Sequence, residues 1–158
     1  MNASELVFAY GSNMDPAQMR ERCPESDLAW FIGEARGWRL YFPRESKKRK
    51  GGVGSIMRSV DDSVWGVVFT VTKRDVARLD SYEGLPSGVY NRDSLNVVNS
   101  DGRNFSPWTY FAVPDGQNRE FVPHSDYITL YIRGAEYFGL PAAYIEKLRN
   151  IRSSARTA

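Results

Sequence analysis

The sequence predicts an α+β fold, a small mixed, mainly antiparallel β-barrel or strongly curved sheet with flanking helices. Two observations support this prediction. Segments with strand character precede most segments with helix character, and the two kinds do not alternate strictly, as they would around a parallel sheet. The 158 residues, 42% of them hydrophobic, are enough to bury one core, and they contain no repeat or long linker. We therefore expect residues 1–158 to form a single domain.

The chain should open with a strand, a glycine turn and a short helix. Leu6–Tyr10 is an apolar run, and Gly11–Asn13 ends it. Asp15-Pro16 then provides an N-cap with proline at the first helical position, and Gln18 stands where a capping-box partner would. We expect this helix to reach about Arg22.

Four short strands should follow. They are predicted at Leu28–Ile32, Trp38–Phe42, Val53–Met57 and Val64–Val71. A polar, basic loop, Arg44–Gly52, separates the second strand from the third, and Asp61-Asp62 supplies a turn before the fourth. This strand-rich stretch is the main source of the predicted sheet.

The next segment should contain a short helix, a loop and a hairpin. Thr72, with Asp75 three residues later, resembles a capping box for a helix over Lys73–Leu79. A loop over Asp80–Val89 follows that helix. The turn sequence Asn99–Gly102 then predicts a hairpin, whose two strands are Tyr90–Val98 and Phe105–Val113.

Two helices should end the chain. Ser125 can cap the first, which runs to Tyr137 and is closed by Gly139. Pro141 suits the first turn of the second, which should reach about Ile151.

Composition excludes several classes of protein. A net charge of +2 is too small to indicate a nucleic-acid or membrane partner by itself. The single cysteine, Cys23, permits no internal disulfide and fits a reducing compartment. Met1–Glu5 has no signal-peptide pattern, and no apolar stretch approaches the roughly 20 residues of a membrane span. We expect a cytoplasmic protein.

Few residues can support metal, nucleotide or thiol chemistry. His124 is the only histidine, so neither a zinc cluster nor a convincing Ser-His-Asp triad can be built, since it stands beside Pro123 in a predicted loop. Cys23 ends a predicted surface helix, which disfavours a Cys-His pair. Phosphate-binding glycine motifs are absent, and Gly51–Gly54 opens a strand rather than a helix. We therefore expect no cofactor and no metal.

Two other segments could support chemistry. In Phe8–Met14, glycine lets the backbone approach a ligand and adopt φ values closed to other residues. Successive N–H groups beside a helix start can bind a carboxylate or an oxyanion, although a simple tight connection explains the same sequence. In Leu79–Tyr90, Glu83 lies between Tyr82 and Tyr90. Partial desolvation there would raise its pKa and suit it to proton transfer, whereas the plainer interpretation is an exposed loop glutamate.

Together these segments resemble the γ-glutamyl cyclotransferases, a family with the AIG2-like fold. The motifs that carry the resemblance occur in the same order, at Tyr10–Asn13, Trp65–Val68, Glu83-Gly84, Ser87–Tyr90, Pro123–Tyr127, Gly134-Ala135, Gly139–Pro141 and Tyr144–Leu148. They extend over roughly Leu6 to Ile151, nearly the whole chain.

The resemblance implies an enzyme that needs no cofactor and converts a γ-glutamyl amino acid or amine to 5-oxoproline and the free amine. Glu83 would act as general base and then as general acid. The glutamyl part would be bound by the loop Tyr10, Gly11, Ser12 and Asn13, mainly through the backbone of Gly11 and Ser12. Tyr90 and Tyr127 match tyrosines that line the pocket, with core packing as the alternative role.

The family also suggests a substrate class. Relatives that act on glutathione tend to have leucine where Asn13 stands, and relatives that act on γ-glutamylamines tend to have Gly-Thr-Leu. Gly11–Asn13 therefore indicates γ-glutamyl amino acids. Relatives are often dimers, so a homodimer is a further expectation, with no nucleic-acid or membrane partner.

Other interpretations of the sequence remain. The same chemistry could remove a γ-glutamyl protecting group in a dedicated pathway, or the domain could bind a ligand without catalysis. Lys47–Lys50 could bind RNA, although no stacking platform accompanies it. We expect the basic loop Arg44–Lys50 to be a solvated surface, with a clamp for an acidic substrate or nucleic acid as the alternative.

Overall fold

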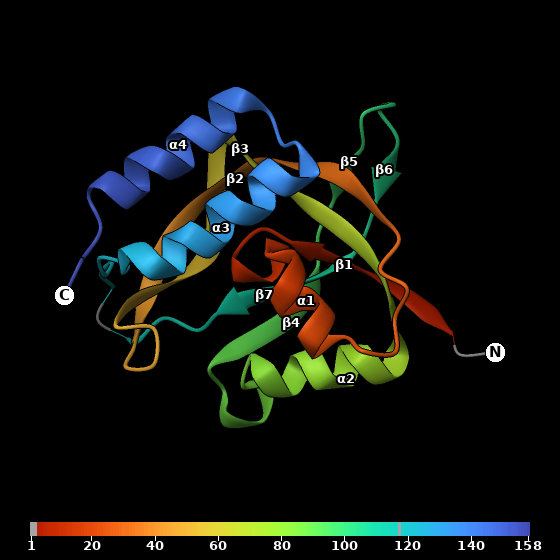
Figure 1. Ribbon diagram of the computed structural model, residues 1–158, viewed down its shortest axis with the longest axis horizontal. Coiled ribbons are helices and arrows are strands. Elements are labelled where there is room, and N and C mark those ends of the chain that lie inside the picture. Colours follow the sequence, from red (N-terminus) through yellow and green to blue (C-terminus); the bar gives the residue numbers. More distant parts are fainter. Residues whose placement is uncertain (1–2, 117) are drawn as a thin grey trace.

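The computed structural model describes residues 3–116 and 118–158, and within these ranges the strands form one curled, seven-stranded sheet with helices packed around it (Figure 1). The strand order is β4-β7-β1-β3-β2-β5-β6. The strands are β1 (Ser4–Ala9), β2 (Trp30–Ser46), β3 (Gly51–Thr72), β4 (Tyr90–Ser94), β5 (Val97–Val98), β6 (Asn104–Phe105) and β7 (Trp108–Ala112). The helices are α1 (Pro16–Arg22), α2 (Lys73–Tyr82), α3 (Ser125–Phe138) and α4 (Ala142–Ser153). The predicted α+β class and curved sheet are confirmed.

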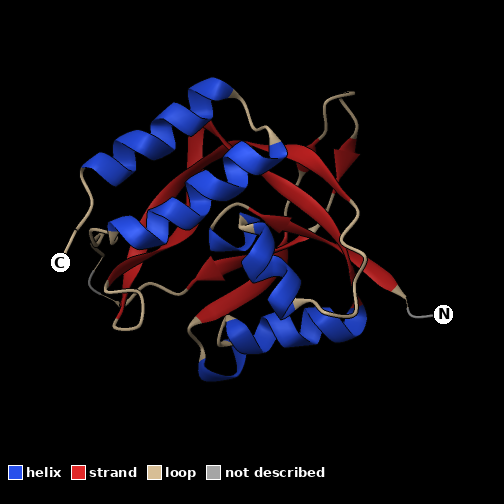
Figure 2. Ribbon diagram, viewed as in Figure 1, coloured by secondary structure: helices blue, strands red, loops and turns tan. Residues whose placement is uncertain are grey.

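Strands β2 and β3 form a long antiparallel hairpin, so the prediction of four short strands was wrong. Their pairing continues from Trp30↔Phe69 to Ser46↔Gly51. The predicted turn at Asp61-Asp62 is an irregularity inside β3, where the register shifts and Gly37 of β2 takes a φ of +83°. Sequence patterns favoured a turn there, but pairing with β2 on both sides keeps the strand continuous. Figure 2 shows the curvature of these long strands.

The predicted hairpin near residue 100 is present, but it is interrupted. Its first part, β4 with β7, joins the sheet next to β1. Its second part, β5 with β6, joins the other edge next to β2. Because one hairpin reaches both edges, the sheet must curl into a half-barrel. The β1–β7 pair is parallel, which makes the sheet mixed.

The helix ends explain where the site residues lie. Asp15 caps α1 by accepting a hydrogen bond from the Gln18 backbone N–H at 3.1 Å, and Thr72 caps α2 in the same way. Helix α2 continues to Tyr82, beyond the predicted Leu79, so Glu83 is its C-cap residue rather than part of an extended loop.

Two further predictions were wrong in detail. His124, not Ser125, caps α3, since the His124 Nδ1 atom accepts a hydrogen bond from the Asp126 N–H at 3.0 Å. Cys23 is fully buried at the end of α1 rather than on a surface helix. Gly139 ends α3 with a φ of 77°, as predicted.

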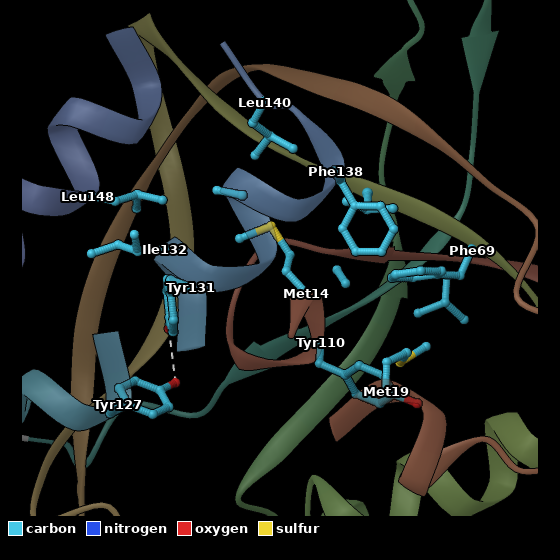
Figure 3. Close-up of a cluster of buried hydrophobic side chains, with 14 of the residues drawn as sticks. Met14, Met19, Phe69, Tyr110, Tyr127, Tyr131, Ile132, Phe138, Leu140 and Leu148 are labelled. Atoms are coloured by element: carbon cyan, nitrogen blue, oxygen red, sulfur yellow. Dashed lines mark hydrogen bonds between the residues drawn. The ribbon is translucent and has the colours of Figure 1, made fainter. Parts of the chain in front are cut away.

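A large apolar core joins the sheet to the helices. Figure 3 shows its members around Met14, Phe69 and Phe138, which come from the loop after β1, from β3 and from α3. Helix α3 approaches that loop so closely at Gly134 that a Cβ atom there would lie 2.3 Å from the Met14 carbonyl oxygen. This contact fixes the loop that carries Asn13. Within the described residues, no helix is long and apolar enough to span a membrane.

Candidate active site

Glu83 lies directly beside the loop that follows β1, Tyr10–Asn13, which we call the glycine loop. The Asn13 Nδ2 atom donates a hydrogen bond to Glu83 Oε1 at 3.1 Å. The C-terminus of α2 thus meets the turn between β1 and α1, although the two residues are 70 positions apart. The Glu83 side chain is only 15% exposed, so the prediction of a partly desolvated carboxylate is confirmed and that of an exposed loop glutamate is wrong.

The surroundings of Glu83 make its proton easier to retain. Burial raises the pKa of the Glu83 carboxyl above its ordinary value. Arg22, the hydrogen bond from Asn13 and the charge of Arg49 oppose that shift without cancelling it. The C-terminal end of α2 carries partial negative charge, which also disfavours a carboxylate. The carboxyl is therefore poised to lose and regain a proton closer to neutral pH than an exposed glutamate.

A polar network orients the Asn13 amide. Its Oδ1 atom accepts hydrogen bonds from Gln18 Nε2 and Arg22 Nη1, each at 3.0 Å. Since both donors occupy the oxygen, the amide nitrogen must face Glu83. Gln18 also donates to the Ser12 hydroxyl at 2.9 Å. Helix α1 therefore holds the glycine loop through side chains that lie one turn apart, Gln18 and Arg22.

The residues proposed from the sequence meet around a small inner pocket of about 40 Å³. Glu83 and all six predicted binding residues, Tyr10, Gly11, Ser12, Asn13, Tyr90 and Tyr127, line it. Sequence reasoning missed several other lining residues, including Gly54, Thr109, Tyr110 and Tyr131. Of these, Tyr131 could have been predicted from the sequence, because it stands one helical turn after Tyr127 and therefore lies on the same face of α3.

Tyrosine hydroxyl groups form the polar part of the inner pocket. The Tyr127 hydroxyl accepts hydrogen bonds from the Gly54 N–H at 3.0 Å and from the Tyr131 hydroxyl at 2.9 Å (Figure 3). Tyr90 donates to the Gly54 carbonyl oxygen at 3.0 Å, and Tyr10 donates to a backbone carbonyl of β7. Burial raises the pKa of each of these four tyrosines. Their hydroxyl groups therefore remain protonated over the physiological pH range.

Gly11 is constrained by its ψ angle and by space. Its φ of −119° is one that other residues adopt, so the expectation of a glycine-only φ was wrong, but its ψ of −138° lies outside the common α and β regions. A Cβ atom at Gly11 would lie 3.2 Å from the Tyr131 hydroxyl oxygen, so Tyr131 would have to shift by a few tenths of an ångström to admit one. Glycine thus lets the loop lie close to the aromatic wall of the pocket.

A second, larger pocket of about 380 Å³ opens next to the first. The two pockets share Ser12, Glu83, Tyr90 and Tyr127 as lining residues. The turn between β2 and β3 forms the far wall of this outer pocket, so the basic loop is not only a solvated surface. Arg49 is partly buried there, with its Nη2 atom donating to Gln18 Oε1 at 3.0 Å and its Cζ atom 5.4 Å from the centre of the Tyr127 ring.

The remaining titratable candidates lie elsewhere. His124 is buried as the cap of α3, and Cys23 is buried against the core, where desolvation raises the pKa of its thiol to about 12. Neither lines the inner or the outer pocket. Among the residues that the structure describes, no three His, Cys, Asp or Glu side chains gather closely enough to hold a metal ion.

Comparisons with known proteins place this geometry in context. Residues 63–148 match the sequence model of the AIG2-like family. The chain is 33% identical to "Gamma-glutamylcyclotransferase" of Mus musculus over 151 residues, which cover 92% of this chain and 78% of the mouse protein. It is 32% identical to the protein of the same name from Homo sapiens over 160 residues, which cover 98% of this chain and 82% of the human protein.

Solved structures show the same fold. A structure named "Gamma-glutamyl cyclotransferase" superposes with a TM-score of 0.85 at 29% identity, covering 93% of this chain and 87% of that one. A glutathione-specific γ-glutamyl cyclotransferase from yeast superposes with a TM-score of 0.68 over 98% of each chain. At 12% identity the yeast protein shares the fold alone.

Proposed function

Since the chain belongs to the AIG2-like family of γ-glutamylcyclotransferases, we propose that it cyclises the glutamyl part of a γ-glutamyl amino acid to 5-oxoproline and releases the free amino acid. The chain is an enzyme of the γ-glutamylcyclotransferase type. The observation that carries the finer proposal is the position of Glu83, a buried carboxyl with a raised pKa that borders both pockets beside the glycine loop.

The substrate contains its own nucleophile, the α-amino group, and its own electrophile, the δ-carbonyl carbon. Ring closure is intramolecular, so the protein mainly has to hold the reactive conformer. Two protons must also move. The α-ammonium group must lose one before attack, and the departing nitrogen must gain one.

Glu83 can make both transfers. Its carboxylate takes a proton from the α-ammonium group, and the amine then forms a C–N bond to the δ-carbonyl carbon. The carboxylic acid returns that proton to the departing nitrogen as the original C–N bond breaks. The attacking nitrogen loses its second proton to solvent, while the released amine takes one up, so charge and atoms balance. A raised pKa suits a group that must act as base and then as acid near neutral pH.

The glycine loop and the tyrosines supply the binding surface. The first N–H groups of the 3₁₀ turn Ser12–Met14 have no partner within that turn, and Ser12 and Asn13 line the inner pocket. We assign the substrate's α-carboxylate to these N–H groups. Tyr90 and Tyr127 border the same space, but the Tyr90 hydroxyl already donates to the Gly54 carbonyl oxygen. The Tyr127 hydroxyl accepts two hydrogen bonds and keeps its own proton for donation, so we assign it to the developing oxyanion.

The direct test is release of 5-oxoproline from γ-glutamyl-alanine by the purified protein. A panel that also contains a γ-glutamyl amine and a γ-glutamyl polyamine separates general activity on γ-glutamyl amino acids from pathway-specific removal of a γ-glutamyl group. Absence of 5-oxoproline from every member of the panel, while each compound binds, would favour a ligand-binding domain without catalysis.

A further inference from the structure

We propose that the outer pocket selects an acidic leaving group, so that the preferred substrates are γ-glutamyl dipeptides whose second residue carries a side-chain carboxylate. This inference rests on the proposed function, because it concerns the part of the substrate that departs. It commits to γ-glutamyl-glutamate and γ-glutamyl-aspartate as the substrate class.

The two pockets divide the substrate between them. The inner pocket, about 40 Å³, has room beside Glu83 for little more than the reacting part. The outer pocket, about 380 Å³, is reached past Glu83, Ser12, Tyr90 and Tyr127, which belong to both. An amine that leaves from the δ-carbonyl therefore lies toward the outer pocket.

The outer pocket carries an excess of positive charge. Four basic side chains line it, from Arg22, Arg44, Lys48 and Arg49, against the two acidic side chains of Glu45 and Glu83. Both acidic groups already have cationic partners. Glu83 lies 3.7 Å from Arg22, and Glu45 lies 3.3 Å from Arg156, which is not part of the pocket.

Among the described residues, three of these cations consequently form no ion pair, although the charge of Arg49 acts on Glu83 at longer range. In the part of the chain that the structure describes, Arg44, Lys48 and Arg49 form no ion pair with any carboxylate. Arg44 donates to the Val113 carbonyl oxygen at 3.1 Å, and Arg49 is held by Gln18 and by the Tyr127 ring. Two arginines are thus fixed in place by neutral partners, with capacity left for an anion.

A neutral leaving amino acid has a single carboxylate, which is fewer than these cations can bind. A second carboxylate adds a charge-assisted contact, and such contacts are stronger than neutral hydrogen bonds. Screening is weaker in a partly buried pocket than at an open surface. The arrangement thus favours a leaving residue with a side-chain carboxylate over its neutral isostere.

The experiment compares γ-glutamyl-glutamate with γ-glutamyl-glutamine, which differ in charge but hardly in shape. We expect kcat/KM to be about tenfold higher for the acidic substrate at low ionic strength, and this ratio to fall as salt is added. Lys48→Gln should lower the ratio several-fold, and Lys48→Glu should lower it further. Lys47→Gln is the matched control, because Lys47 belongs to the same turn but does not line the pocket, and it should leave the ratio unchanged.

The outcomes separate the inference from the function on which it rests. If neither dipeptide nor γ-glutamyl-alanine yields 5-oxoproline, the proposed function fails and the inference fails with it. If γ-glutamyl-alanine reacts and neither dipeptide does, the function stands and the inference is overturned. If both react with equal kcat/KM, or the glutamine dipeptide reacts faster, the function stands and the acidic preference is overturned. A preference that persists unchanged in Lys48→Glu would also overturn the assignment to this pocket.

Discussion

The Asn13 amide nitrogen lies 3.1 Å from Glu83 Oε1, and this hydrogen bond joins the glycine loop to the end of α2. Because Gln18 and Arg22 occupy the other end of the amide, Asn13 can present only its N–H group to the carboxylate. The loop that is proposed to bind the glutamyl part is therefore tied directly to the proposed proton carrier.

Replacing Glu83 by glutamine removes the proton carrier and keeps the side-chain shape. We expect Glu83→Gln to lower kcat for γ-glutamyl-alanine by about 10²- to 10⁴-fold, the usual contribution of one general acid–base residue. Release of 5-oxoproline measures the rate, and circular dichroism checks that the fold is retained. Turnover close to wild type in a pure, folded variant would remove Glu83 from the mechanism.

Asn13→Asp tests the hydrogen bond between the loop and the carboxyl. Aspartate keeps the acceptor for Gln18 and Arg22, but it loses the donor and sets a second carboxyl about where the amide nitrogen lay. Two adjacent carboxyls share a proton, so the acidic limb of the kcat/KM profile should move to higher pH and activity at pH 7 should fall.

Asn104→Asp is the control for that change, because Asn104 is exposed on β6 and lines neither pocket. Its pH profile should match that of the wild type. An unshifted acidic limb in Asn13→Asp would show that the amide does not influence the ionisation on which activity depends.

Arg22→Met tests the electrostatic control of Glu83. The Arg22 guanidinium lies 3.7 Å from Glu83 Oε1 and lowers the pKa of that carboxyl. Without this cation the pKa should rise further, so the acidic limb of kcat/KM moves to higher pH, since the base must be ionised in the free enzyme. Arg20→Met removes the same charge from the same helix, where Arg20 donates to the Ser26 carbonyl oxygen. An equal shift in both variants would point to a general charge effect instead.

Gly134→Ala tests the packing that supports the glycine loop. Alanine ordinarily favours a helix by about 1 kcal/mol over glycine. Here its Cβ atom would lie 2.3 Å from the Met14 carbonyl oxygen, so the helix or the loop must move. We expect a net loss of about 1–3 kcal/mol in the free energy of unfolding, measured with urea. Glu136→Ala, at an exposed site on α3, should change it by about 1 kcal/mol at most, and a more stable Gly134→Ala would contradict the contact.

Local sequence signals predicted the helix caps at Asp15, Thr72 and Gly139, because each cap depends on residues within one turn. The two candidate segments, Phe8–Met14 and Leu79–Tyr90, were singled out from their residues, and their proposed roles came from the family resemblance. The structure brings Asn13 and Glu83 of these segments together. His124 was missed as a cap because imidazole is an unusual N-cap acceptor. Its role depends on side-chain orientation, which the order of residues does not reveal.

Long-range pairing accounts for the remaining errors. Strands β2 and β3 each continue through their register shifts because they pair with one another on both sides of every shift. No short window of sequence contains both strands, so this pairing could not be predicted locally. The same hairpin register carries Arg49 to the wall of the outer pocket. A basic loop is ordinarily solvated, so its place beside Glu83 could be recognised only once the register was known. Arg22 could have been predicted as a residue near the site, because it lies one helical turn after Gln18 on the same face of α1.

The pH dependence of stability gives a test of Glu83 that does not require a substrate. Its raised pKa means that the folded protein holds this proton more tightly than the unfolded chain does. The stability that protonation provides is fully present below the unfolded pKa of about 4.3 and is lost as pH rises through the folded value. Glutamine does not titrate, so subtracting the unfolding free energy of Glu83→Gln cancels the other groups. We expect the wild-type value minus the variant value to fall with rising pH across this window and to be constant above it. A difference that rises over the same window would mean that the folded carboxyl has a lowered pKa, and Glu83 would then be too weak a base to accept a proton near pH 7.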